Sequence, residues 1–137
     1  MLSQLRIARP VNDLERSARM YIRGLELVEL GRFEDHAGFD GVMLGRTELN
    51  WHLEFTHARH GGVTPSPTPE DLLVIYLPDH DEWTATCARL LQAGFMSTRS
   101  FNPYWESRGR TFSDADGYRI VVENDRWSGV GPRAASR

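Results

Sequence analysis

The stretch FSDADGYRIVVEND, residues 112–125, decides how the fold is interpreted. It predicts a strand that opens with Asp-Ala-Asp-Gly-Tyr and runs from Arg119 to Glu123, through a β-branched segment. Traced back from this strand, the chain shows the order strand, helix, strand, strand, strand. The same order occurs a second time nearer the N-terminus, which indicates an internal repeat.

Each copy of the repeat has one amphipathic helical segment, and a glycine closes that segment, Gly24 in the first copy and Gly94 in the second. The first copy is predicted as a strand at 5–11, a helix within 12–30, and strands at 27–33, 39–45 and 50–57. The second is predicted as a strand at 72–79, a helix at 80–94, and strands at 95–101, 109–114 and 118–125.

These segments predict one domain over residues 1–128, made of a module at 1–60 and a module at 70–128. Residues 61–69 are rich in proline and glycine and are predicted to be the linker between the modules. Residues 129–137 are small and polar and are predicted to form a flexible tail.

The composition excludes several kinds of function. The net charge of −3 argues against a nucleic-acid partner. All 16 basic residues are arginine, so lysine Schiff-base chemistry and a P-loop lysine are excluded. The lone Cys87 lies in a helical pattern and is predicted to be a buried structural thiol. Without a signal sequence or an apolar run of membrane-spanning length, we expect a bacterial protein of the cytoplasm with no membrane partner.

Two phrases carry a resemblance to a known family. RPVNDLERSARMYIRGLEL (9–27) resembles the opening strand-helix phrase of the vicinal oxygen chelate superfamily, and RTFSDADGYRIVVEN (110–124) resembles its closing phrase. NPYW followed by GRTF is similar to its bleomycin-resistance-like branch. The resemblance implies an α+β fold in which two tandem βαβββ modules form a curved mixed sheet around a central groove, and it implies a homodimer.

Metal-dependent members of that superfamily set four ligands in the groove, from the first and last strand of each module. The corresponding positions here are Arg6, Glu54, Leu73 and Val121, and Leu72 beside Leu73 is no better a ligand. A guanidinium has hydrogen-bond donors but no atom that can bind a cation, and a hydrocarbon side chain has no polar atom at all. Of the four ligand positions, only Glu54 therefore retains a side chain that can bind a metal. We therefore expect no metal ion, with a divalent metal as the alternative and His52 and Glu54 as weak candidate ligands.

Strand alternation places His52, Glu54 and Thr56 on one face of the fourth predicted strand, pointing into the groove. Three roles for Glu54 stay open: an ion pair with Arg6, contact with a ligand, and general-base catalysis. Alternation in the second module predicts that Leu73 and Ile75 line the groove with Arg119 and Val121.

The predicted ligand-binding residues combine charged, aromatic and apolar side chains, as small-molecule sites do: Arg6, His52, Glu54, Tyr104, Trp105, Arg119 and Val121. Tyr104 and Trp105 either stack on a ligand, or plug the groove, or contact a second subunit. Arg9 breaks the apolar pattern, which indicates either a bulge at Pro10 or a register shifted by one residue.

The function predicted from these residues is metal-independent binding of a small molecule in the groove, with no cofactor. The alternative is a divergent lyase, isomerase or dioxygenase that uses Glu54 as metal ligand or general base. A third possibility is a structural or regulatory protein whose groove is filled by its own side chains.

Overall fold

The computed structural model describes residues 1–129 and consists of two modules with the same element order. The first contains β1 (Leu5–Pro10), α1 (Leu14–Leu25), β2 (Val28–His36), β3 (Phe39–Gly45) and β4 (Trp51–Ala58). The second contains β5 (Leu72–Tyr76), α2 (His80–Gln92), β6 (Met96–Thr98), the 3₁₀ helix η1 (Pro103–Glu106), β7 (Gly109–Ser113) and β8 (Arg119–Glu123). The predicted α+β fold of two βαβββ modules is confirmed. The tail predicted at 129–137 lies, beyond Gly129, outside the described residues.

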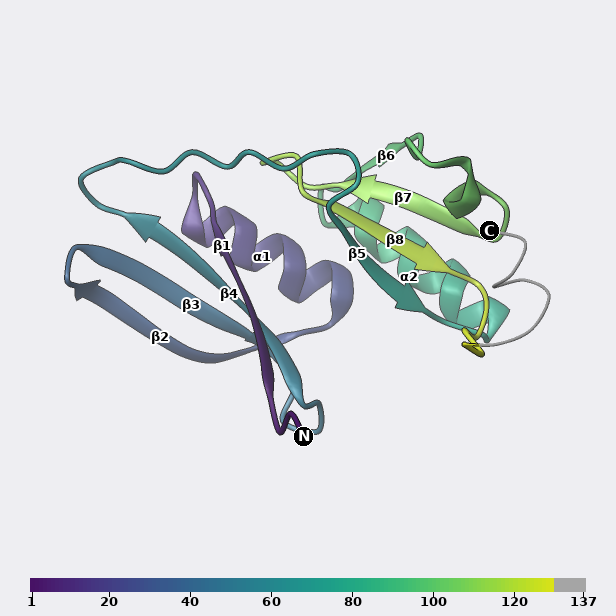
Figure 1. Cartoon of the computed structure of the whole chain (residues 1–137), viewed down its shortest axis with the longest axis horizontal. Helices are drawn as coiled ribbons and strands as arrows, with labels where there is room; N and C mark the ends of the chain where they lie inside the picture. Colours follow the sequence, from purple (N-terminus) through teal and green to yellow (C-terminus); the bar gives the residue numbers. More distant parts are fainter. Residues whose placement is uncertain (130–137) are drawn as a thin grey trace.

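Each module folds into its own four-stranded mixed sheet, in the order β1-β4-β3-β2 and β5-β8-β7-β6 (Figure 1). The first and last strands of each module pair in parallel, and the remaining pairs are antiparallel. None of the helices within residues 1–129 is long and apolar enough to cross a membrane.

One core joins the two modules. The Tyr21 ring of α1 packs edge-on against Phe55 of its own sheet, at 4.9 Å between ring centres, and against Phe95 of the second module, at 5.1 Å. Leu90 of α2 lies so close to Gly24 of α1 that a methyl group on Gly24 would come within 2.9 Å of it. The helices therefore pack against each other, and the glycine lets them approach closely.

The side of β5 that faces this core differs from the prediction. Leu73 and Ile75 pack against the shared core in register with Ile120 and Val122, so the prediction that they line the groove is wrong. All five residues of β5 are apolar or aromatic and all are half-buried. The strand therefore shows no alternation of polar and apolar residues that would indicate which side faces the core. The groove-facing neighbour of Arg119 is Leu72, which makes Leu72 the counterpart of Arg6.

Arg9 lies on the core side of a regular strand. The pairing of β1 with β4 runs without interruption through Pro10 and Thr56, so the structure shows neither the bulge nor the shifted register. The guanidinium of Arg9 instead lies over the ring of Tyr118 in the second module, at 4.6 Å from the ring centre. A cation on an aromatic face is a favourable way to place an arginine beside a core.

The Asp-Ala-Asp-Gly-Tyr turn fastens the second module to the first. Asp114 accepts a hydrogen bond from Tyr21 at 2.7 Å, and Asp116 accepts one from Asn12 at 2.9 Å. Tyr118 donates to the carbonyl oxygen of Pro10 at 2.9 Å. The carboxylates that mark this stretch of sequence thus serve the contact between modules.

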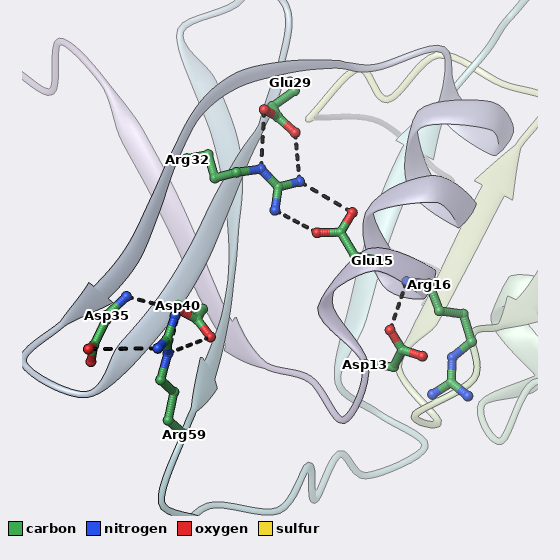
Figure 2. Close-up of polar contacts among 8 residues, drawn as sticks. All are labelled: Asp13, Glu15, Arg16, Glu29, Arg32, Asp35, Asp40 and Arg59. Carbon is green, nitrogen blue, oxygen red and sulfur yellow. Dashed lines mark hydrogen bonds and ion pairs between the residues drawn. The ribbon is translucent and has the colours of Figure 1, made fainter.

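Ion pairs lie on the surface of the first module (Figure 2). Arg32 of β2 bridges Glu15 of α1 at 2.6 Å and Glu29 of its own strand at 2.9 Å. Arg59 pairs with Asp40 of β3 at 2.9 Å, and its hydrogen bonds lower the pKa of that carboxyl group. Exposed pairs of this kind contribute little individually to stability.

Candidate ligand-binding groove

Three predicted residues come together on the face of the first sheet that points away from the helices. Arg6 of β1 lies in register with His52 of β4, and Glu54 follows two residues later on the same face. The Nε of Arg6 donates to Nε2 of His52 at 2.8 Å, and its NH1 lies 3.4 Å from Oε2 of Glu54. Of the three roles left open for Glu54, the structure shows the ion pair with Arg6, and His52 is an additional partner of Arg6.

This arrangement fixes the form of the His52 ring. A guanidinium only donates hydrogen bonds, so Nε2 of His52 must accept and the imidazole is neutral, with its proton on Nδ1. The His52 side chain is buried, the Glu54 side chain is 14% exposed and the Arg6 side chain is 49% exposed. Arg6 is thus the part of the cluster that a molecule in solution reaches first.

An apolar floor lies beside this polar cluster. Met43 of β3 stands directly opposite Glu54, and Gly41 stands opposite Thr56. The ring of Phe33 lies across Gly41, where an added methyl group would come within 2.2 Å of the ring. Gly41 therefore leaves the space that the Phe33 ring occupies, and Phe33 and Met43 together give this part of the face an apolar character.

The corresponding face of the second sheet is covered by the chain itself. Ser100 bonds to Thr111 of β7 at 2.6 Å, Arg119 donates to the carbonyl oxygen of Arg99, and η1 lies over Gly109. Under this segment, residues 99–108, Thr111 is 1% exposed and Val121 is fully buried. Both lie outside the core shared with the helices, so the segment creates a second, smaller buried layer.

The structure therefore divides the predicted ligand-binding residues into two groups. Arg6, His52 and Glu54 form one accessible cluster on the first sheet. The other four belong to the second sheet or its covering segment: Tyr104, Trp105, Arg119 and Val121. Trp105 is 6% exposed and Val121 is fully buried, so both side chains pack between the second sheet and its covering segment. Tyr104, which packs edge-on against Trp105, and Arg119 are half-buried.

Sequence reasoning missed Glu123, the last residue of β8. It is completely buried on the groove side of the second sheet, in register with Tyr76 and opposite Gly109. A methyl group on Gly109 would fall on Oε2 of Glu123, so the glycine leaves room for the carboxylate. The alternation that placed Val121 on this face also places Glu123 there, and that signal was available in the sequence.

The face of the first sheet continues into a cavity of about 360 Å³ under the linker. Thr56 and Phe39 extend from the sheet into its wall, and Gly62 and Val63 of the linker form its cover. His57 lies at this wall with Nδ1 3.2 Å from the carbonyl oxygen of Val11, which can only accept, so Nδ1 carries a proton. The cavity has a volume in the range that small ligands require, and Thr56 in its wall lies two residues beyond Glu54 on the same strand, whereas Arg6, His52 and Glu54 do not line it.

The residues of the cluster do not fit a metal ion. The two atoms that could ligate it, Nε2 of His52 and Oε2 of Glu54, both face the guanidinium of Arg6, a permanent cation. Within residues 1–129 no group of three or more histidine, cysteine, aspartate or glutamate side chains is arranged to hold a metal. Zinc in proteins takes three or four protein ligands, which this cluster does not supply.

The two-module fold with its outward sheet faces is that of the glyoxalase, bleomycin-resistance and fosfomycin-resistance proteins of the vicinal oxygen chelate superfamily. Family models of the YycE-like N-terminal and C-terminal domains match residues 5–56 and 70–124. The uncharacterised protein YycE of Bacillus subtilis is 43% identical over 124 residues, which cover 90% of this chain and 89% of that protein. The chain belongs to the YycE-like family.

Solved structures agree with this assignment. The crystal structure of Bacillus subtilis YycE, a protein of unknown function, superposes with a TM-score of 0.86 at 42% identity, over 94% of this chain and 95% of that one. The fosfomycin resistance protein FosX of Mesorhizobium loti gives 0.70 at 14% identity, over 100% and 98%. TnmS3, an antibiotic-binding protein of Streptomyces, gives 0.59 at 24% identity, over 88% and 92%. The last two similarities show the fold alone.

Proposed function

We propose that the protein binds a small organic molecule on the outward face of its first sheet, without a metal ion or other cofactor. The observation that carries the proposal is the guanidinium of Arg6, which occupies the space between His52 and Glu54. Polar groups that converge beside apolar side chains, here Met43 and Phe33, are the usual composition of a small-molecule site.

We further propose that the protein works as a homodimer. The two sheets of one chain are connected through the helix pair, so their groove faces are presented outward. Large apolar side chains remain exposed on the groove face of the first sheet, Leu30 at 41% and Phe39 at 44%. A second copy laid over this face would cover them and close a groove around the ligand.

The alternative function, an enzyme with Glu54 as general base, rests on the partial exposure of that carboxylate at the groove. Replacement of Glu54 by Gln separates the two functions. The variant would lose all turnover of a substrate if Glu54 moves a proton, and it would change only affinity or stability if the protein binds without chemistry.

Thermal denaturation in the presence of candidate ligands tests the proposed function. Glutathione adducts, catechols and glycopeptides form a suitable panel, and a ligand at 100 times its Kd should stabilise the fold by about 2.7 kcal/mol. Metal analysis of the purified protein is done in parallel. Stoichiometric zinc, nickel, manganese or iron bound by Glu54 and neighbouring imidazoles would overturn the proposal.

A further inference from the structure

We infer that the ligand of the first sheet carries an anionic oxygen group, a carboxylate or a phosphonate, attached to an apolar body about the size of one ring. This inference names the class of ligand for the proposed binding function and rests on that function. Arg6 is assigned to the anionic group, and Met43 and Phe33 are assigned to the apolar body.

The hydrogen bonds of Arg6 leave part of its guanidinium available. Of its nitrogen donors, Nε is used by His52, and NH1 makes a long contact of 3.4 Å with Glu54. NH2 makes no hydrogen bond to any side chain or backbone group in residues 1–129, and half of the side chain is exposed. The neighbouring NH1 and NH2 groups form a planar fork, which matches a carboxylate or phosphonate with two parallel hydrogen bonds.

His52 and Glu54 hold this fork in place. The short bond from Nε to the buried His52 ring fixes the plane of the guanidinium, and Glu54 limits its rotation. An arginine held in this way loses less side-chain entropy when it binds an anion than a free surface arginine does. The cluster therefore acts as a preorganised anion receptor.

The exposed charge of the cluster also favours an anion. The Arg6 side chain is 49% exposed, whereas the Glu54 side chain is 14% exposed. A ligand on this face therefore meets the guanidinium more than the carboxylate, and a negative charge on the ligand complements it.

The apolar floor defines the remainder of the ligand. Met43 lies opposite Glu54, and the Phe33 ring covers Gly41, which lies opposite Thr56, so both apolar side chains lie on the same face and both are half-buried in the free protein. A hydrocarbon body laid over them would remove apolar surface from water. A bare inorganic anion would gain none of this contribution, so the organic anion is preferred.

Phenylphosphonate and benzoate are the probes, with benzamide as the neutral control and benzylamine as the cationic control. Binding is measured by the ligand-dependent shift of the unfolding temperature and by NMR titration at millimolar ligand. We expect saturable binding of the two anions, and at least tenfold weaker binding of the two controls. Arg6→Met should weaken the binding of the anions at least tenfold, whereas Arg19→Met, at an exposed helix position, should leave it unchanged.

Two further variants keep the test decisive if Arg6→Met does not fold. Arg6→Lys retains the charge but not the fork and should give intermediate affinity, and Glu54→Gln removes a competing carboxylate and should tighten binding of the anions. Equal binding of benzamide and phenylphosphonate, an unchanged affinity in folded Arg6→Met, or no binding of either anion would overturn the inference. A groove ligand without an anionic group would overturn it as well, while the proposed binding function would stand.

Discussion

Tyr21 of α1 donates a hydrogen bond of 2.7 Å to Asp114 in the closing turn of the second module. The bond joins residues far apart in the chain, and both groups are shielded from water at the contact between modules. Burial raises the pKa of both side chains, and the proximity of the Asp114 carboxylate raises that of Tyr21 further. The relative placement of the two sheets thus depends on a polar contact at the edge of the shared core.

Removal of this hydroxyl group should destabilise the protein. Tyr21→Phe leaves the Asp114 carboxylate without its phenolic donor, and hydrogen bonds to charged groups are typically worth about 1.5–3 kcal/mol. Tyr118→Phe is a matched control, because it removes a bond of 2.9 Å to the neutral carbonyl oxygen of Pro10, worth about 0.5–1.5 kcal/mol. Urea denaturation measures both, and equal losses would show that the charge on Asp114 contributes nothing to the contact.

The raised pKa of Asp114 predicts a dependence of stability on pH. The folded protein binds this proton more tightly than the unfolded chain, whose value is the ordinary 3.8. The contribution of Asp114 to the free energy of unfolding is therefore greatest at low pH, and it falls as pH rises from about 4 through the folded value. Exposed carboxylates with lowered pKa, such as Asp40 and Asp71, act in the opposite direction.

Asp114→Asn isolates this contribution, because it cannot ionise. The variant should be less stable at every pH, since one amide replaces the oxygen acceptors of three hydrogen bonds. The loss should be largest below the ordinary Asp pKa of 3.8 and smaller at neutral pH, as measured by urea denaturation across the range. A difference that stays constant with pH would show that burial does not perturb Asp114.

The sequence predicted the fold because the two copies of the repeat carry the same element order, each with a helix closed by glycine. It also gave the ion pair of Arg6 with Glu54 as one of three roles for Glu54, since the first strand of a module was expected to approach its last, and the structure shows this pair. It failed at β5, where five consecutive hydrophobic or aromatic residues, Leu72–Tyr76, gave no sign of which face was buried.

The covering of the second sheet was beyond prediction for another reason. The segment 99–108 is held by single contacts, such as those of Ser100 with Thr111 and with Glu106. Contacts of this kind leave no periodic pattern of hydrophobic residues in the sequence from which they could be predicted. The sequence left three roles open for the aromatic pair Tyr104 and Trp105: stacking on a ligand, plugging the groove, and contact with a second subunit. Only the three-dimensional position of Trp105, buried over the sheet, shows that it fills space.

A cavity made in this covered layer should be costly. Trp105→Ala removes a buried indole and should destabilise the protein by about 3–5 kcal/mol. Trp127, which is 57% exposed, provides the control, and Trp127→Ala should cost less than about 0.5 kcal/mol. Thermal denaturation and far-UV circular dichroism measure both variants. Similar stabilities would mean that the segment over the second sheet is not packed as described.

The close approach of Gly109 to Glu123 supports a separate prediction. Gly109→Ala would push a methyl group into the Glu123 carboxylate and to within 2.9 Å of the carbonyl oxygen of Trp105, so the strand or the covering segment must move. Overpacking of this kind costs about 1–3 kcal/mol. Gly31→Ala is the control, because its methyl group meets only the flexible end of Met43 at 3.0 Å, and it should be tolerated. Thermal unfolding of the two variants measures the difference, and equal losses would contradict the packing of Glu123 under Gly109.

Replacement of the guanidinium by an imidazole tests whether Arg6 takes the place of a cation. Arg6→His would set a third ligand beside His52, its partner in the β1–β4 register, and Glu54 on the same face, which suffices for a zinc ion with water as fourth ligand. Equilibrium dialysis with zinc should give binding close to one ion per chain in this variant, and substoichiometric binding in the wild type and in Arg6→Met. The combination of Arg6→His with Glu54→Gln should lose the metal again, because a neutral amide is a poor zinc ligand. Stoichiometric zinc in the wild type, or none in a folded Arg6→His variant, would show that the arginine does not stand between two potential metal ligands in solution.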